Sequence, residues 1–136
     1  MTAGRTFLVV DDSRLHHQMY RLIFSRPALA GSTLLHAYDG RDGYAQLLAH
    51  PELTMVFLDL NMPGMTGLEF LDRRRDERLH LQVPVVLVTT ESSAEDEARG
   101  LAAGAAAYLR KPFTPEQLEA LVVRMTQRAS AAASGS

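Results

Sequence analysis

Short apolar runs alternate with longer amphipathic segments along the whole chain. Five runs lie at residues 7–10, 33–37, 55–59, 84–88 and 106–110. A strand that is buried on both faces reads as a continuous apolar run, so we predict five buried strands. Each run is followed by a helical pattern, and the residues that favour helix starts are Ser13, Asp39, Thr66, Ser93 and Thr114.

The helix after Ser13 shows the pattern best. Leu15, Met19, Leu22 and Ile23 fall on one stripe at helical spacing. We expect this stripe to face the sheet.

The last helix begins with a capping box, in which Thr114 and Gln117 flank a proline at the first helical position. Beyond it the residues are small and offer nothing to bury. We therefore expect one domain over residues 1–128 and a flexible tail or linker stub over residues 129–136.

Five strands that alternate with five helices predict an α/β fold. The expected architecture is a doubly wound, five-stranded parallel sheet with helices on both faces, which makes three α/β/α layers. In such a sheet the carboxyl ends of all strands lie along one edge, where ligands bind.

Polar residues end four of the predicted strands. Asp11 and Asp12 follow the first, Asp59 ends the third, Thr89 follows the fourth and Lys111 follows the fifth. Each alone has an ordinary explanation, and Asp59 alone reads equally well as a turn or capping aspartate. Together they predict one site at the carboxyl edge of the sheet.

Composition narrows the class of protein. The chain has 136 residues, 46% of them hydrophobic, and a net charge of −2, which argues against nucleic acid and against a membrane surface. No signal peptide or membrane-spanning run is visible, so we expect a cytoplasmic protein. The charged run at residues 73–78 reads as a solvated helix face.

Lys111 is the only lysine beside thirteen arginines, which suggests that a compact ammonium is required there.

The predicted site suits phosphoryl transfer. Clustered carboxylates repel each other unless a cation intervenes, and an all-oxygen set without cysteine or a convergent histidine favours Mg²⁺, with Mn²⁺ as an alternative. An ion, an ammonium and a hydroxyl leave a gap that fits a phosphoryl group. A carboxylate can itself be the acceptor and form an aspartyl phosphate.

Four motifs now resemble those of a response-regulator receiver domain of the CheY-like, single-domain kind, with similarity over about residues 6–127. The motifs are Val10-Asp11-Asp12-Ser13, Asp59-Leu60-Asn61-Met62-Pro63-Gly64-Met65-Thr66-Gly67, Val88-Thr89-Thr90-Glu91 and Tyr108-Leu109-Arg110-Lys111-Pro112-Phe113. The resemblance implies a flavodoxin-like strand order of 2-1-3-4-5 in a two-component signalling protein that is a phosphoacceptor rather than an enzyme.

The resemblance also implies roles for the polar residues. Asp59 would accept phosphate from a histidine kinase or a histidine phosphotransfer protein. Asp12 and Asp59 would bind Mg²⁺ directly with the backbone carbonyl of Asn61, while Asp11 would act mostly through water. Lys111 would hold a phosphoryl oxygen.

Thr89 and Tyr108 would form the switch. Thr89 would move toward the phosphoryl group and Tyr108 would swing inward after it, which changes the face formed by the fourth helix, fifth strand and fifth helix. A downstream protein would read that face. Few residues follow the last predicted helix, so we expect output by protein contact rather than through DNA.

Asn61, Thr90 and Glu91 correspond to the rim of the family's site, and the family also has a cis peptide bond at the position of Lys111–Pro112. Thr90 departs from the alanine or glycine that is common after the switch threonine. His17 departs from a frequent arginine, which affects only expected contacts of the helix surface.

Two other interpretations remain open. A Mg²⁺-dependent phosphohydrolase of the haloacid-dehalogenase type would use a second aspartate two residues after the first, where this chain has Asn61. A pseudo-receiver would be a phosphate-independent interaction module, although such modules usually lose an acidic residue or the lysine. A dinucleotide-binding fold is excluded because no G-x-G-x-x-G follows the first strand.

Overall fold

The computed structural model describes residues 4–90 and 94–135, with side chains through residue 127. Strands and helices alternate as predicted, and the strands lie within one residue of the predicted bounds. The elements are β1 (Thr6–Val10), α1 (Arg14–Phe24), η1 (Pro27–Leu29), β2 (Thr33–Ala37), α2 (Gly40–Ala49), β3 (Met55–Asp59), α3 (Gly67–Glu77), β4 (Val85–Thr89), α4 (Ala94–Ala102), β5 (Ala107–Arg110) and α5 (Pro115–Gly135).

The strands form one parallel sheet in the order β2-β1-β3-β4-β5. This order confirms the doubly wound, flavodoxin-like fold. Every residue of the central strands β3 and β4 is buried, which is what their uninterrupted apolar runs predict.

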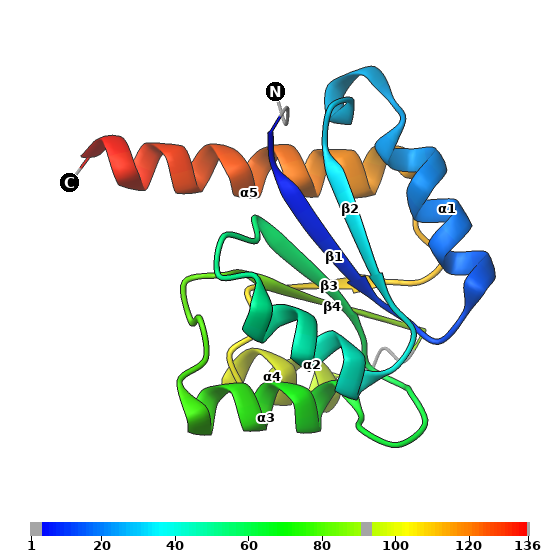
Figure 1. Cartoon of the computed structure of the whole chain (residues 1–136), viewed down its shortest axis with the longest axis vertical. Coiled ribbons are helices and arrows are strands. Elements are labelled where there is room, and N and C mark those ends of the chain that lie inside the picture. The colour runs from blue at the N-terminus through cyan, green and yellow to red at the C-terminus, as the bar shows by residue number, and fades with distance from the viewer. Residues whose placement is uncertain (1–3, 91–93, 136) are drawn as a thin grey trace.

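Helices cover both faces of the sheet (Figure 1). Side chains of β1 alternate between them: Phe7 and Val9 pack with α1 and α5, whereas Leu8 and Val10 pack with α2 and α3. The two cores are therefore separate, and the sheet divides them. The three-layer arrangement leaves the two edges of strand ends as the places where polar residues can gather.

The predicted buried stripe of α1 is confirmed for Ile23, which is buried, and for Met19, which packs against the core, but was wrong for Leu15 and Leu22. Leu15 and Leu22 are 72% and 73% exposed, whereas His17 and Tyr20 are buried. Ile23 belongs to both the predicted and the observed face. His17 was expected on the helix surface because the sequence does not show which groups it bonds. A polar side chain can be buried when it has a hydrogen-bond partner.

The solvated-face prediction for residues 73–78 also needs correction at one position. Arg74 is only 3% exposed, and its guanidinium donates to the carbonyls of Leu79, His80 and Val83 at 3.2, 3.0 and 2.6 Å. These carbonyls lie in the loop after α3 and need donors. Arg74 is therefore a structural residue that fastens this loop.

The C-terminal helix agrees with its predicted start but not with its predicted end. The Gln117 N–H donates to Thr114 Oγ1 at 3.1 Å and Gln117 Oε1 accepts from the Thr114 N–H at 2.8 Å, which confirms the capping box. However, α5 continues to Gly135, where a tail was expected, and projects past the sheet (Figure 1). Alanine-rich sequence favours helix without burial, which explains the extension. The domain boundary at residue 128 stays a prediction.

The start of the fourth helix was predicted at Ser93, which lies outside the described residues. Among the residues that the structure describes, no helix is both long and apolar enough to cross a membrane.

Candidate functional site

The carboxyl edge of the sheet gathers the polar residues as predicted. Asp11 follows β1, Asp59 ends β3 and Thr89 ends β4. Lys111 follows β5, and its backbone N–H donates to the carbonyl of Thr89 at 2.8 Å. This bond ties the lysine to the end of β4 and brings its side chain to the same edge as the aspartates.

Three carboxylates form the centre of the site. Asp11, Asp12 and Asp59 each offer an oxygen, and these atoms all lie within 4.8 Å of one another. Asp11 and Asp59 are 2% and 7% exposed, whereas Asp12 is open to solvent. Like charges at this spacing repel each other, so the cluster is unfavourable without a compensating cation.

Asp11 is well supplied with donors. Its Oδ1 accepts from the Ser13 N–H at 2.8 Å, and its Oδ2 accepts from Lys111 Nζ at 3.0 Å. Burial by itself raises the pKa of Asp11, but the Ser13 N–H, Lys111 and His16 outweigh it and hold that pKa below its ordinary value. Asp11 is therefore a stable anion.

Asp59 has fewer and longer contacts. Its Oδ1 accepts from the Asn61 N–H at 3.2 Å, and its Oδ2 lies 3.7 Å from Lys111 Nζ. Burial, with repulsion from Asp11 and Asp12, raises the pKa of Asp59 above its ordinary value despite the opposing Lys111 ammonium. Asp59 is thus the carboxylate that gains most from new partners.

The start of α3 supports the end of β3. The Gly67 N–H donates to the Leu60 carbonyl at 3.0 Å, and a Cβ added at Gly67 would lie 2.8 Å from the Asp59 carbonyl oxygen. Thr66 caps the helix by accepting from the Glu69 N–H at 3.2 Å. The Thr66-Gly67 sequence therefore allows the close approach that sets the backbone of Asp59.

Lys111 lies between the two buried carboxylates. Its side chain is 9% exposed, and its ammonium is closer to Asp11 than to Asp59, at 3.0 against 3.7 Å. An ammonium in this position offsets part of the repulsion within the cluster. The peptide bond between Lys111 and Pro112 is cis, as the resemblance implied.

The other predicted site residues surround this centre. Thr89 is fully buried and its Oγ1 accepts from Asn61 Nδ2 at 3.5 Å, whereas Thr90 is exposed at the site's mouth. Tyr108 is half-buried and packs against the core on the α2–α4 side. Glu91 lies outside the described residues.

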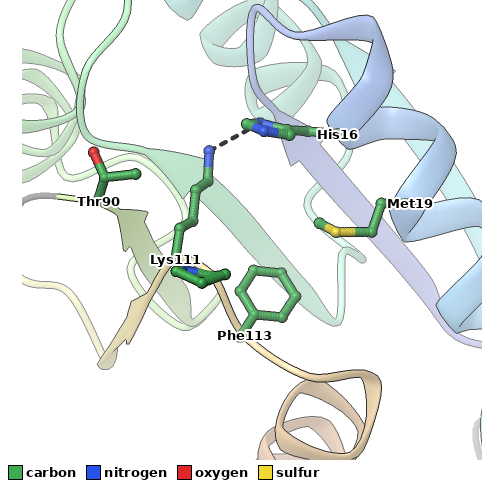
Figure 2. Close-up of a pocket in the computed structure, with 6 residues that line it drawn as sticks. His16, Met19, Thr90, Lys111 and Phe113 are labelled. Carbon is green, nitrogen blue, oxygen red and sulfur yellow. Dashed lines mark hydrogen bonds between the residues drawn. The ribbon is translucent and has the colours of Figure 1, made fainter.

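His16 belongs to the site, so the expectation of no convergent histidine was wrong. Its Nδ1 lies 3.0 Å from both Asp11 Oδ2 and Lys111 Nζ, and Figure 2 shows the ring directed at the lysine. The sequence did carry a signal: Ser13 caps α1 directly after the aspartates, and the third residue beyond a cap lies over it.

His17 is buried behind the site rather than on the helix surface. It contacts the Asp11 carbonyl through Nε2 at 2.7 Å and His36 Nδ1 through Nδ1 at 2.6 Å. The Asp11 carbonyl can only accept, so His17 Nε2–H donates to it, and the contact between the two Nδ1 atoms requires one ring to donate and the other to accept. Burial, with the charges of Arg21 and His17, lowers the pKa of His36 to about 4.

A cavity of about 260 Å³ opens next to the lysine. Its lining residues are His16, Met19, Thr90, Lys111, Pro112 and Phe113 (Figure 2). Met19, Pro112 and Phe113 give the cavity an apolar part, whereas Lys111 and His16 place nitrogen atoms within 3.0 Å of the Asp11 carboxylate. A small group can therefore reach the ammonium from solvent.

The carboxylate cluster fits a hard divalent cation. Asp11, Asp12 and Asp59 offer oxygen donors alone, which is the chemistry that Mg²⁺ prefers. Burial and repulsion from Asp11 and Asp12 raise the pKa of Asp59, and a bound cation would favour its ionised form. His16 directs its nitrogen to Lys111, so it leaves the oxygen character of the set unchanged.

Comparison with known proteins identifies the class. Residues 7–123 match the family described as response regulator receiver domain, and the chain belongs to this family. It is 32% identical to the chemotaxis protein CheY1 of Helicobacter pylori over 112 residues, which cover 82% of this chain and 89% of that protein. It is 31% identical to the phosphate regulon regulatory protein PhoB of Escherichia coli, covering 93% of this chain and 54% of that one.

A solved structure agrees. The chemotaxis protein CheY4 of Vibrio cholerae superimposes with a TM-score of 0.79 at 35% identity, covering 90% of this chain and 99% of that one. The protein is thus a receiver domain of the two-component response-regulator class, a CheY-like signalling protein. This assignment favours the receiver interpretation over the phosphohydrolase one.

Proposed function

We propose that the protein is a phosphorylation switch in which Asp59 accepts a phosphoryl group from the phosphohistidine of a histidine kinase or histidine phosphotransfer protein. One observation carries the proposal: Asp59 is a buried carboxylate with a raised pKa, few donors of its own and an ammonium 3.7 Å away. New contacts made by a phosphoryl group and a cation would relieve its environment. Asp11, which already has its donors, has less to gain.

The transfer forms one bond and breaks another. An Asp59 oxygen attacks phosphorus as the phosphorus–nitrogen bond of the donor breaks, and the leaving imidazole keeps the electron pair and takes a proton from solvent. Asp11, Asp12 and Asp59, with the backbone carbonyl of Asn61, would hold Mg²⁺, which would supply positive charge next to the phosphoryl oxygens. Lys111 supplies further positive charge from the opposite side.

The response would pass from Thr89 to the surface. Thr89 lies beside Lys111 through the backbone bond of 2.8 Å, so its hydroxyl can move to a phosphoryl oxygen on Asp59. Tyr108 on β5 would follow and change the α4–β5–α5 face. A downstream protein in the cytoplasm would then bind or release that face.

The test uses a small phosphodonor. The protein, incubated with acetyl phosphate and Mg²⁺, should gain one phosphoryl group by intact-mass spectrometry, and Asp59→Asn should gain none. Asp72→Asn is the matched control, because Asp72 is an exposed aspartate on α3 whose ion pair with Arg75 is remote from the strand edge. A fully labelled Asp59→Asn variant would contradict the proposal, and an unlabelled wild type would favour a phosphate-independent module.

A further inference from the structure

His16 contacts the two charged groups on which the site depends. Its Nδ1 lies 3.0 Å from Lys111 Nζ and 3.0 Å from Asp11 Oδ2, and Lys111 Nζ is also 3.0 Å from that oxygen. The three atoms thus form a closed triangle. Neither the motifs nor the roles described above use this histidine.

The chemistry of the groups limits the possible directions of these bonds. An ammonium carries three donors and no acceptor, whereas a carboxylate only accepts. His16 Nδ1 can serve only one of its two contacts: with a proton it donates to Asp11 Oδ2, and with the ring proton on Nε2 instead it accepts from Lys111 Nζ. In the second tautomer both contacts of Lys111 are satisfied, because the ammonium donates to Asp11 Oδ2 and to His16 Nδ1. The ammonium then has one anionic and one neutral acceptor, and its third N–H faces Asp59.

The neutral acceptor matters because Asp11 belongs to the carboxylate cluster. A cation bound by the carboxylates would compete with Lys111 for their negative charge. His16 gives the ammonium a contact that does not depend on this charge and does not cancel the positive charge of the lysine. A lysine has a flexible stem, so fixing its end reduces the freedom it must lose when it binds a phosphoryl oxygen.

We propose that His16 is a positioning residue that anchors the Lys111 ammonium for its contact with the phosphoryl group on Asp59. This inference rests on the proposed phosphorylation of Asp59. Its geometric part, the anchoring of Lys111, stands independently of any phosphodonor.

A structural role for His16 is separable from this one. The His16 side chain is 36% exposed, and His16 is absent from both hydrophobic cores, so its replacement should leave the fold intact. His16→Asn keeps an acceptor close to the position of Nδ1, whereas His16→Leu keeps the bulk and removes the acceptor. Met19→Leu is the matched control, since Met19 lines the same cavity without contacting Lys111 through a polar atom.

The first measurement takes advantage of Lys111 being the only lysine. In protein labelled with ¹⁵N and ¹³C at lysine alone, one set of side-chain signals reports the mobility of Lys111. Without metal, His16→Leu should make this side chain more mobile. His16→Asn and Met19→Leu should leave it close to wild type.

The second measurement is the rate of phosphorylation by acetyl phosphate at saturating Mg²⁺. His16→Leu should slow it by roughly tenfold, the size expected for one lost hydrogen bond to a charged group, and His16→Asn should restore most of the rate. Mg²⁺ affinity, followed by titration, should be unchanged in both variants.

The outcomes separate the two proposals. Unchanged Lys111 mobility in His16→Leu, or an equal loss of rate in His16→Leu and His16→Asn, would overturn the anchoring role. Greater mobility in His16→Leu, in a protein whose Asp59 takes no phosphate, would support the anchor and contradict the phosphorylation switch instead.

Discussion

The ends of β1 and β3 each carry a buried aspartate, Asp11 and Asp59, but the two carboxylates differ in their contacts and in the direction of their pKa shifts. Both strands run through the core into a buried aspartate, and both aspartates face the same lysine. Asp11 receives a backbone N–H at 2.8 Å and the ammonium at 3.0 Å, whereas Asp59 receives them at 3.2 and 3.7 Å. The pKa of Asp11 is lowered and that of Asp59 is raised.

Under the proposed function, this difference would separate a metal ligand, Asp11, from the group that reacts, Asp59. A carboxylate whose donors are already in place is a fixed negative charge, and moving it costs its hydrogen bonds. A carboxylate with long contacts and a raised pKa has more to gain from a new bond. In the proposed switch, the aspartate at the end of β1 would hold its charge in position, and the aspartate at the end of β3 would change its partners.

Replacing the shared lysine should have the largest effect. Lys111→Arg keeps the charge but puts a planar fork into a space where the side chain is 9% exposed. We expect Mg²⁺ binding to survive and the phosphorylation-induced change to be mostly lost, as measured by Mg²⁺ titration and by partner binding or NMR shifts after acetyl phosphate. Arg110→Lys is the control at the exposed neighbour, and a normal response in Lys111→Arg would show that the ammonium is dispensable.

Bound Mg²⁺ should compensate the charge of Asp59 as well as that of Asp11 and should stabilise the native state. An ion that binds the native state alone adds about 2.7 kcal/mol to the free energy of unfolding at a hundredfold excess over Kd. Asp12→Ala should remove most of this gain, whereas Asp76→Ala, an exposed charge on α3, should not. Thermal unfolding with Mg²⁺ and with EDTA measures it, and equal melting of the wild type in both would argue against a metal site.

Neutralising each buried carboxylate should change stability in opposite directions. In EDTA at neutral pH, Asp59→Asn should raise the free energy of unfolding by about 1 kcal/mol, because it removes an ill-compensated charge. Asp11→Asn should lower it by about 1 to 2 kcal/mol, because Ser13 and Lys111 lose a charged acceptor. Urea unfolding of both variants measures the signs, and two changes of the same sign would refute the comparison.

The pH dependence of these differences has a defined sign. A raised native pKa means that ionising Asp59 costs stability as pH rises from its ordinary value of 3.8 through the native value. The advantage of Asp59→Asn should therefore vanish in acid. Asp11 has a lowered native pKa, so its contribution is complete above 3.8 and is lost as pH falls through the native value. Unfolding curves across this range, as differences from wild type, measure both.

Thr90 should have the smallest effect, on access alone. It is exposed at the cavity beside Lys111, where we expect its methyl group and hydroxyl to crowd an incoming phosphodonor or water. Thr90→Ala should speed phosphate uptake and loss severalfold, or about 1 kcal/mol of barrier, with unchanged Mg²⁺ affinity. Thr90→Ser separates the methyl group from the hydroxyl. Equal rates in wild type and Thr90→Ala would mean that Thr90 only helps to start the fourth helix, and slower rates in the alanine variant would mean that its hydroxyl assists.

The sequence by itself determined the strands, their polar ends and the edge where those ends meet. A buried parallel strand requires an apolar run, and the carboxyl ends of parallel strands must share an edge, so Asp11, Asp59, Thr89 and Lys111 could be placed together without coordinates. These properties are local, or follow from topology alone.

Only the tertiary structure decided which face of α1 is buried and which carboxylate has a raised pKa. The buried face of α1 depends on what lies against it, and the partners that allow His17 to be buried come from β1 and β2. The opposite pKa shifts of Asp11 and Asp59 arise from contacts that only the fold sets: Ser13, Lys111 and His16 outweigh burial and lower the pKa of Asp11, whereas burial and repulsion from Asp11 and Asp12 raise that of Asp59. Electrostatic energy depends on distance and burial, which the order of residues does not specify. The position of His16 at the site likewise depends on distances that only the fold sets.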